Sequence, residues 1–297
     1  LGSVSRELGV KEIKELITSF GNAARRAKEA GFDAVQVHAA HGYLINQFIS
    51  PRTNLREDEY GGSLKNRCRF LIEVIEQIRQ EVGQDFPVLL RLSAEEELPE
   101  GYTIDYILEV IHLIKDMVEA IELSSGTHES FEWIIQPKSI ERNCYTTYTK
   151  LVKQEVSIPV GVVGRIKTPQ DAEKILKDKK ADFIILGRAL IADPMFASKI
   201  KNNSVNEIRE CIACNRCYDE VYKKDGSIRC AVNPFAGRES TLKVLPILTK
   251  KRVLIVGGGC GGLQAAIIAK KRGHDVVLYE KDGFLGGQAI LASRNPM

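Results

Sequence analysis

The sequence Phe32-Asp-Ala-Val-Gln-Val-His38-Ala-Ala-His41-Gly-Tyr43 decides the fold of this chain. Its first seven residues form a short apolar run after Gly31, a natural helix stop, and so predict a buried strand. Two imidazoles and a phenol follow where that strand ends. At the carboxyl end of a barrel strand, side chains converge on the mouth, where barrel enzymes place their chemistry. His38, His41 and Tyr43 are therefore the first candidate site; the alternative is that the histidines cap the strand or bind a structural water.

The same alternation of helix and strand continues over residues 10–200. Apolar residues at helical spacing predict helices over about 10–30, 64–82, 103–118 and 168–179. Short apolar runs predict four further strands at 87–93, 120–125, 159–164 and 182–187, with a loop-rich stretch and one amphipathic helix within 128–156. Such strands are expected to be parallel and buried on both faces. Five of them suit part of a (β/α)₈ barrel or a doubly wound sheet, and periodicity does not choose between the two.

Length and composition set the broad class. The 297 residues could form one large domain or two medium ones, and 44% hydrophobic with 27% charged residues is ordinary for a globular protein. The net charge of +3 looks too small and too evenly spread to favour nucleic acid or a membrane surface. No apolar run approaches the roughly 20 residues of a transmembrane helix, and the first residues lack the pattern of a signal peptide.

Four of the seven cysteines are clustered, as Cys211-x-x-Cys214-x-x-Cys217 followed by Cys230. Structural zinc prefers two separated Cys-x-x-Cys pairs, whereas three crowded cysteines and a distant fourth favour a [4Fe–4S] cluster. Zinc and plain thiols are the alternatives. The remaining three cysteines stand alone and are expected to be inert thiols: Cys68, Cys144 and Cys260. Clustered cysteines of this kind indicate a reducing cytosol rather than a secreted disulfide framework.

A second α/β motif begins at residue 251. An apolar strand over 252–256 precedes Gly257-x-Gly259-x-x-Gly262, an Ala-rich helix follows over about 260–272, and a strand over 275–280 ends at Glu280. Glycines at this spacing let a pyrophosphate approach the helix start, and the carboxylate is well placed for a ribose hydroxyl. The motif predicts a dinucleotide site for FAD, with a bare NAD site as the alternative.

Taken together, these motifs resemble a known family. His38-Ala-Ala-His41-Gly-Tyr43, the segment 47–63 and Asn66-Arg67 are similar to the signature of the old yellow enzyme family of flavoproteins. The cysteine segment and the glycine motif resemble its long, multi-cofactor branch, which includes 2,4-dienoyl-CoA reductase, 2-enoate reductase and NADH:flavin oxidoreductases. The resemblance spans essentially the whole chain and implies a (β/α)₈ barrel.

The resemblance also implies roles for the first site. In the family, the histidine pair binds the substrate carbonyl and the tyrosine protonates the α-carbon, which maps onto His38, His41 and Tyr43. Donors at the carbonyl would stabilise the charge that develops there when hydride reaches the β-carbon, and a phenol is mostly protonated at neutral pH.

Arg91 lies within the apolar strand 87–93 and should meet an anion or a ligand, since a lone buried cation is costly. The resemblance places the matching arginine against the pyrimidine side of FMN. The alternative is a salt bridge to a carboxylate on a neighbouring strand, such as Glu122. The loop after this strand, Glu95 to Glu97, could line the site but is expected to be an exposed acidic loop.

The FMN phosphate is assigned by the resemblance to the ends of the last two barrel strands, at Gly164, Arg165, Gly187 and Arg188. Glycines there let backbone N–H groups approach a phosphate, although they could equally mark tight turns. Relatives commonly have Cys-x-x-Cys-x-x-x-Cys, so Cys217 comes one residue early in this chain. Gly286-Gly287-Gln288 matches the early part of the FAD domain of long-branch relatives.

The sequence therefore predicts an α/β chain in three parts: strands 4–8 of an FMN-binding TIM barrel over 1–200, a [4Fe–4S] connector over 201–250, and the start of a Rossmann-like FAD/NAD(P)-binding domain over 251–297. Electrons would pass from NAD(P)H to FAD, the cluster and FMN, and then as hydride to the C=C bond of an enone, enoate or dienoyl-CoA. The alternatives are an amine dehydrogenase of the trimethylamine dehydrogenase type and a catalytically silent piece that binds FMN poorly, since five strands cannot close an eight-stranded barrel. The expected location is the cytosol, without nucleic-acid or membrane partners; the substrate and the oligomeric state stay open.

Overall fold

The computed structural model describes residues 6–223 and 226–294. The chain forms two compact units, Leu1–Asn215 and Arg216–Met297, and each is described by itself. Neither unit has, in these described ranges, a helix long and apolar enough to cross a membrane. The three-part division expected from the sequence stays a prediction.

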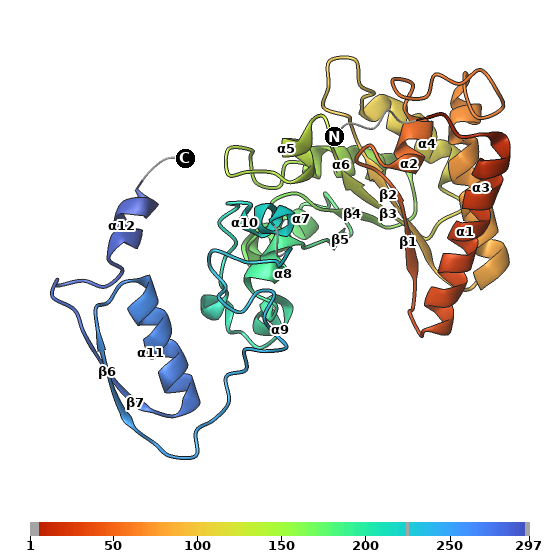
Figure 1. Ribbon diagram of the computed structural model, residues 1–297. Helices are drawn as coiled ribbons and strands as arrows, with labels where there is room; N and C mark the ends of the chain where they lie inside the picture. The colour runs from red at the N-terminus through yellow and green to blue at the C-terminus, as the bar shows by residue number, and fades with distance from the viewer. Residues whose placement is uncertain (1–5, 224–225, 295–297) are drawn as a thin grey trace. The chain divides into compact units, whose positions relative to one another are not determined.

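Unit 1 is built on one parallel sheet (Figure 1). Its strands are β1 (Val35–Ala39), β2 (Val88–Ser93), β3 (Ala120–Ser124), β4 (Val160–Val162) and β5 (Phe183–Ile184). They lie side by side in chain order, so the sheet lacks the reversal of strand order that defines a doubly wound sheet. This order is that of a barrel segment, and it decides between the two architectures that the periodicity allowed.

The last two strands are shorter than expected. β4 ends at Val162 because Gly164 follows with a φ of +113°, a conformation that an extended strand does not use. β5 has only two residues, although the N–H of Ile185 still donates to the carbonyl of Val162. A three-residue β4 offers its neighbour few groups to pair with, so the predicted strand over 182–187 is mostly loop.

The helices follow the local sequence signals. Ser63 accepts a hydrogen bond from the N–H of Asn66 and starts α3, which ends before Gly83 in the left-handed region. Thr168 caps α7 in the same way, with Pro169 as the first helical residue. The helices and 3₁₀ turns of unit 1 are α1 (Val10–Glu29), α2 (Leu44–Ile49), α3 (Leu64–Val82), α4 (Ile104–Ile114), α5 (Phe131–Ile134), α6 (Thr146–Glu155), α7 (Pro169–Lys177), α8 (Arg188–Ala192), α9 (Phe196–Lys201) and η1 (Val205–Glu207).

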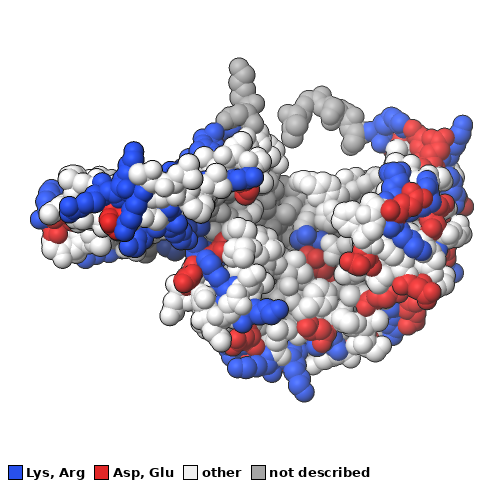
Figure 2. Space-filling view, turned by 90° about the horizontal axis from the view of Figure 1, so that it is seen from below, with Lys and Arg blue, Asp and Glu red and all other residues white. Residues whose placement is uncertain are grey.

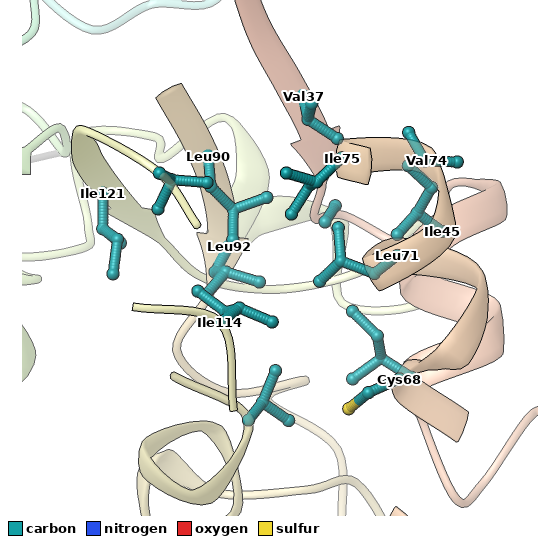
Figure 3. Close-up of a cluster of buried hydrophobic side chains, with 14 of the residues drawn as sticks. Val37, Ile45, Cys68, Leu71, Val74, Ile75, Leu90, Leu92, Ile114 and Ile121 are labelled. Atoms are coloured by element: carbon teal, nitrogen blue, oxygen red, sulfur yellow. The ribbon is translucent and has the colours of Figure 1, made fainter. Parts of the chain in front are cut away.

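The core lies between the sheet and its helices. Figure 3 shows Leu71, Val74 and Ile75 of α3 next to side chains of the strands, and all three are fully buried. The strand residues Val37, Leu90 and Ile121 are at most 3% exposed and belong to the same cluster. Each such side chain contributes about 1.5–3 kcal/mol by leaving water. Because successive strand residues point to opposite faces, the residues that follow these three point to the other face of the sheet.

Unit 2 contains the predicted βαβ motif. β6 (Arg252–Val256) pairs in parallel with β7 (Asp275–Tyr279), and α11 (Cys260–Arg272) connects them. Its other elements are α10 (Arg216–Asp219), η2 (Glu220–Tyr222) and α12 (Gln288–Ser293). No residue of β6, α11 or β7 is buried. The last turn of α11 carries Lys270, Lys271 and Arg272. Blue Lys and Arg side chains prevail over red carboxylates on the left of Figure 2, where this unit is drawn, so the positive charge is less evenly spread than the sequence suggested.

Candidate active site

One row of residues crosses the face of the sheet opposite to α3. His38 pairs with Arg91, Arg91 with Glu122, Glu122 with Gly161 and Gly161 with Phe183. We call this the inner face. Strand register thus places a histidine from β1, an arginine from β2 and a carboxylate from β3 side by side, which no short-range sequence pattern could show.

Three of the predicted residues form one cluster at the carboxyl end of β1. The ring centroids of His38 and His41 are 5.2 Å apart, and those of His38 and Tyr43 are 5.0 Å apart. A fourth ring, that of His128, lies 4.9 Å from Tyr43 with an edge-to-face geometry. His128 was missed in the sequence, although it follows the end of β3 just as His41 and Tyr43 follow the end of β1.

Both histidines of the pair are neutral at physiological pH. Burial, and after it the positive charge of Arg91, lowers the pKa of His38 to about 4. The same two causes, followed by the neighbouring His38 and His128, lower the pKa of His41 to about 3. A neutral imidazole offers one N–H donor and one acceptor. The pair can therefore donate to an oxygen atom without carrying charge.

The turn that carries His41 is held by buried hydrogen bonds. His41 has a φ of +63°, and its N–H donates to Oγ of Ser93 over 2.9 Å. That hydroxyl in turn donates to the carbonyl of Gly126 over 3.0 Å, which joins the β1 turn to the His128 loop. Nε2 of His41 is buried and has no hydrogen-bond partner among the described residues. An unused buried donor or acceptor of this kind fits a ligand atom better than a solely structural role.

Arg91 forms the salt bridge that the sequence offered as an alternative. Its Nε lies 3.1 Å from Oε1 of Glu122, whose other oxygen accepts a hydrogen bond from Gln36 over 2.9 Å. Glu122 is 4% exposed. The salt bridge leaves Arg91 accessible to a ligand, because its side chain is still 26% exposed.

The prediction of an exposed acidic loop from Glu95 to Glu97 is wrong for its central residue. Glu96 is only 1% exposed, and its burial raises the pKa of the carboxyl. Glu97 accepts a hydrogen bond from Ser125 over 2.8 Å, and burial likewise raises its pKa. This loop packs against the segment after β3 instead of extending into solvent.

The ends of β4 and β5 have room and charge for a phosphate. A Cβ on Gly164 would lie 2.7 Å from the ring of Tyr145, whereas one on Gly187 would meet nothing within 4 Å. Arg165 has a φ of +51° and a buried Nε without a partner in the described part of the chain. Burial, followed by the charge of Arg188, lowers the pKa of Arg165. An anion would relieve this crowding of positive charge, so Arg165, Arg188 and the open space at Gly187 fit a phosphate group, whereas Gly164 is already required by its positive φ and by the Tyr145 ring.

Comparison with known proteins places this arrangement in a family. The sequence model described as NADH:flavin oxidoreductase / NADH oxidase family matches residues 2–207, and that of FAD dependent oxidoreductases matches residues 252–297. The chain belongs to the NADH:flavin oxidoreductase family. It is 45% identical to an NADH oxidase of Thermoanaerobacter brockii over 100% of this chain and 46% of that protein. It is 36% identical to a cinnamate reductase of Clostridium sporogenes over 97% of this chain and 46% of that protein.

Solved structures agree with the family. A 2-naphthoyl-CoA reductase complex superposes with a TM-score of 0.93 at 34% identity, over 98% of this chain and 45% of that one. Histamine dehydrogenase from Rhizobium sp. 4-9 gives 0.87 at 34% identity, over 96% and 42%. The five-stranded sheet is therefore part of a TIM barrel of the old yellow enzyme type. The chain spans about half the length of these relatives.

The predicted cysteine ligands of this family member are divided between the units. Cys211 and Cys214 lie in unit 1, and Cys217 and Cys230 lie in unit 2. In residues 6–223 and 226–294, no group of three or more His, Cys, Asp or Glu side chains is arranged to hold a metal ion. The cluster stays a prediction. Burial raises the pKa of Cys68 to about 12 and that of Cys144 to about 11, as expected for inert thiols.

The glycine loop of the FAD-type motif closes on its own carboxylate. The N–H of Gly258 donates to Oε2 of Glu280 over 2.6 Å, and this bond lowers the pKa of Glu280. A Cβ on Gly262 would lie 1.9 Å from the carbonyl oxygen of Gly257, which itself has a φ of +100°. Gly257 and Gly262 are thus required by the backbone. Gly259 would tolerate a Cβ, with nothing within 4 Å, and leaves open space at the loop.

Proposed function

We propose that the protein is an NAD(P)H-dependent ene-reductase, which reduces the activated C=C bond of an enone, enoate or dienoyl-CoA. The observation that carries this proposal is the buried, unpartnered Nε2 of His41 beside His38 and Tyr43. Relatives named cinnamate reductase and 2-naphthoyl-CoA reductase support the substrate class.

His38 and His41 would bind the substrate carbonyl. Because both imidazoles are neutral, with pKa values near 4 and 3, each can donate one N–H to the oxygen. Fixed donors at that oxygen stabilise the negative charge that develops on it during reduction. Bound FMN would supply the hydride for the β-carbon.

Tyr43 would protonate the α-carbon. Its ring is 49% exposed and contacts both His38 and His128, so the phenol can reach a ligand in front of the pair. His128 is exposed and offers a route by which the phenol regains its proton from water. We therefore propose His38, His41 and Tyr43 as the catalytic residues and add His128 as a residue that acts through Tyr43.

The cofactor sites complete the proposal. FMN would be held by Arg91 and, at its phosphate, by Gly164, Arg165, Gly187 and Arg188. A [4Fe–4S] cluster would use four thiolates, those of Cys211, Cys214, Cys217 and Cys230. FAD would bind the motif formed by Gly257, Gly259, Gly262 and Glu280, with NAD(P)H as the electron donor.

Amine dehydrogenation is the second candidate, because histamine dehydrogenase has a similar structure. An amine substrate has no carbonyl oxygen for the two imidazoles to bind. The His38–His41 pair therefore favours reduction of an activated C=C bond.

The test is Tyr43→Phe in the FMN-loaded protein, assayed without oxygen against cinnamate and a cyclic enone. Loss of the proton donor should lower kcat by about 10²–10⁴-fold, while affinity for the carbonyl ligand changes little. Tyr222→Phe, at an exposed tyrosine, is the control and should keep full activity. Undiminished activity of Tyr43→Phe, or turnover of histamine or dimethylamine but of no enoate, would refute the proposal.

A further inference from the structure

Three polar side chains form a triad on the inner face: Gln36 of β1, Arg91 of β2 and Glu122 of β3. Glu122 lies between the other two, with one oxygen 3.1 Å from Nε of Arg91 and the other 2.9 Å from Nε2 of Gln36. Nε of Arg91 also lies 3.5 Å from Oγ of Ser124. The parallel register of the three strands fixes this arrangement.

The triad uses only one side of the Arg91 guanidinium. Its contacts to Glu122 and Ser124 are made through Nε, and its two terminal amino groups make no hydrogen bond to any residue that the structure describes. Arg91 keeps 26% of its side-chain exposure, whereas Glu122 keeps 4%. The arginine thus presents its outer edge to a ligand while the carboxylate stays behind it.

A buried carboxylate beside a cation offsets part of that cation's charge. For a negative charge at the outer edge of the arginine, the carboxylate about 3 Å behind the cation weakens the attraction without cancelling it, and the hydrogen-bonding edge of the arginine is unchanged. The neighbouring imidazoles add no charge, because both are neutral at physiological pH. A ligand on the inner face would therefore meet a directional donor with a reduced positive potential.

We infer that Glu122 is a charge-compensating residue, which orients Arg91 and weakens its stabilisation of extra negative charge on a ligand of the inner face. This inference rests on the proposed function, in which that ligand is FMN. Glu122 then sets how strongly the protein favours anionic forms of the flavin, without touching it. Gln36 donates a hydrogen bond to the second carboxylate oxygen of Glu122 and so fixes the orientation of the Arg91–Glu122 pair.

The test is Glu122→Gln, which keeps the size of the side chain and removes its charge. The probe is sulfite, which adds to oxidised flavin and leaves it with one more negative charge. In the FMN-loaded protein, the dissociation constant for sulfite should fall by about tenfold, the effect of one nearby charge. The midpoint potential of the FMN should become more positive in the same variant.

Three further variants sharpen this test. Gln36→Glu combined with Glu122→Gln returns a carboxylate to the triad and should bring sulfite affinity back toward that of the wild type. Glu119→Gln is the matched control, since Glu119 also pairs with an arginine, Arg79, but directly before β3 at the opposite end of the strand. It should leave sulfite affinity unchanged, because Glu119 precedes β3 and contacts no member of the triad, whereas Glu122 lies in the middle of that strand. If Glu122→Gln does not fold, the single variant Gln36→Glu adds negative charge and should weaken sulfite binding.

The outcomes separate this inference from the proposed function. A folded, FMN-loaded Glu122→Gln protein with wild-type sulfite affinity and potential would overturn the compensating role alone. An equal change in Glu119→Gln would also overturn it, because the effect would then not be local. If the wild-type chain itself takes up no FMN, the proposed function fails and this inference fails with it.

Discussion

Strands β1–β3 project reactive side chains from the inner face, whereas β6 and β7 flank a loop in which the backbone makes the contacts. In unit 1, His38, Arg91 and Glu122 come from three different strands and meet through register. In unit 2, Gly258 follows β6 and Glu280 follows β7, and the parallel pairing of these two strands brings the two residues together. The first site depends on charge and protonation. The second depends on the absence of Cβ atoms.

Because the two sites are built differently, substitutions should impair them in different ways. A side-chain site loses function when one group changes its charge or donor, while the fold persists. A glycine loop fails when one added carbon atom has no space, so cofactor binding and local folding fail together. The cysteine segment offers a third case, because its predicted ligands are soft thiolates, which we expect to come together only around a metal.

The largest expected effect is on the cysteine segment. Isolated without oxygen and reconstituted with iron and sulfide, the chain should hold about four iron atoms and absorb broadly near 400 nm, as expected for a [4Fe–4S] cluster. Cys214→Ser should abolish both signals, because a hydroxyl is a poor substitute for a thiolate. Metal analysis and absorption spectroscopy give the result.

Cys260→Ser is the control for this experiment, since Cys260 is an exposed thiol at the start of α11 and outside the predicted ligand set. It should keep the iron content of the wild type. Stoichiometric zinc instead of iron would contradict the prediction and favour the zinc alternative.

The glycine loop gives the next largest effect. Gly262→Ala would put a Cβ 1.9 Å from the carbonyl oxygen of Gly257, a distance that the backbone must move to relieve. The variant should lose FAD on gel filtration and should unfold at lower temperature.

Gly261→Ala is the matched control, because it makes the same chemical change but its Cβ would meet nothing within 4 Å. It lies in the first turn of α11 and should keep FAD, with a helix stabilised by up to about 1 kcal/mol. If both variants keep FAD equally well, the lack of space beside Gly262 does not matter for FAD binding.

The same contrast explains what the sequence could predict. Glycine spacing and apolar periodicity are local signals, so the βαβ motif of unit 2 and the strands of unit 1 could be found within a residue or two at most boundaries. The ends of β4 and β5 could not, because the end of β4 depends on the positive φ of Gly164 and the end of β5 depends on how much of β4 it can pair with. The choice between barrel and doubly wound sheet needed the strand order, which is a tertiary property.

Within the site, the sequence predicted the residues that lie close together in the chain. His38, His41 and Tyr43 were found for this reason, and the structure brings them together. His128 was missed because it reaches Tyr43 only through the pairing of β3 with β2, which in turn pairs with β1. Glu96 looked exposed because a run of three carboxylates has no apolar pattern, yet its segment packs against the loop after β3.

The smallest expected effect comes from the neutral histidines, and it is a pH dependence of stability. His38 and His41 have folded pKa values of about 4 and 3, below the value of about 6.5 in an unfolded chain. Below pH 6.5 the unfolded state therefore binds protons that the folded state does not. Each histidine should lower the free energy of unfolding by about 1.4 kcal/mol for each pH unit between pH 6.5 and its folded pKa.

His41→Asn should remove one of these two contributions, and asparagine tolerates the φ of +63° at this position. Urea unfolding at pH 6.5, 6.0, 5.5 and 5.0 should then show a smaller pH slope than that of the wild type, with the difference rising toward about 1.4 kcal/mol per unit at the lowest pH. If His41→Asn keeps the full slope, His41 is already charged in the folded protein. His38 and His41 would then not form a neutral donor pair. The difference between a neutral side-chain site in unit 1 and a basic surface in unit 2 would be lost.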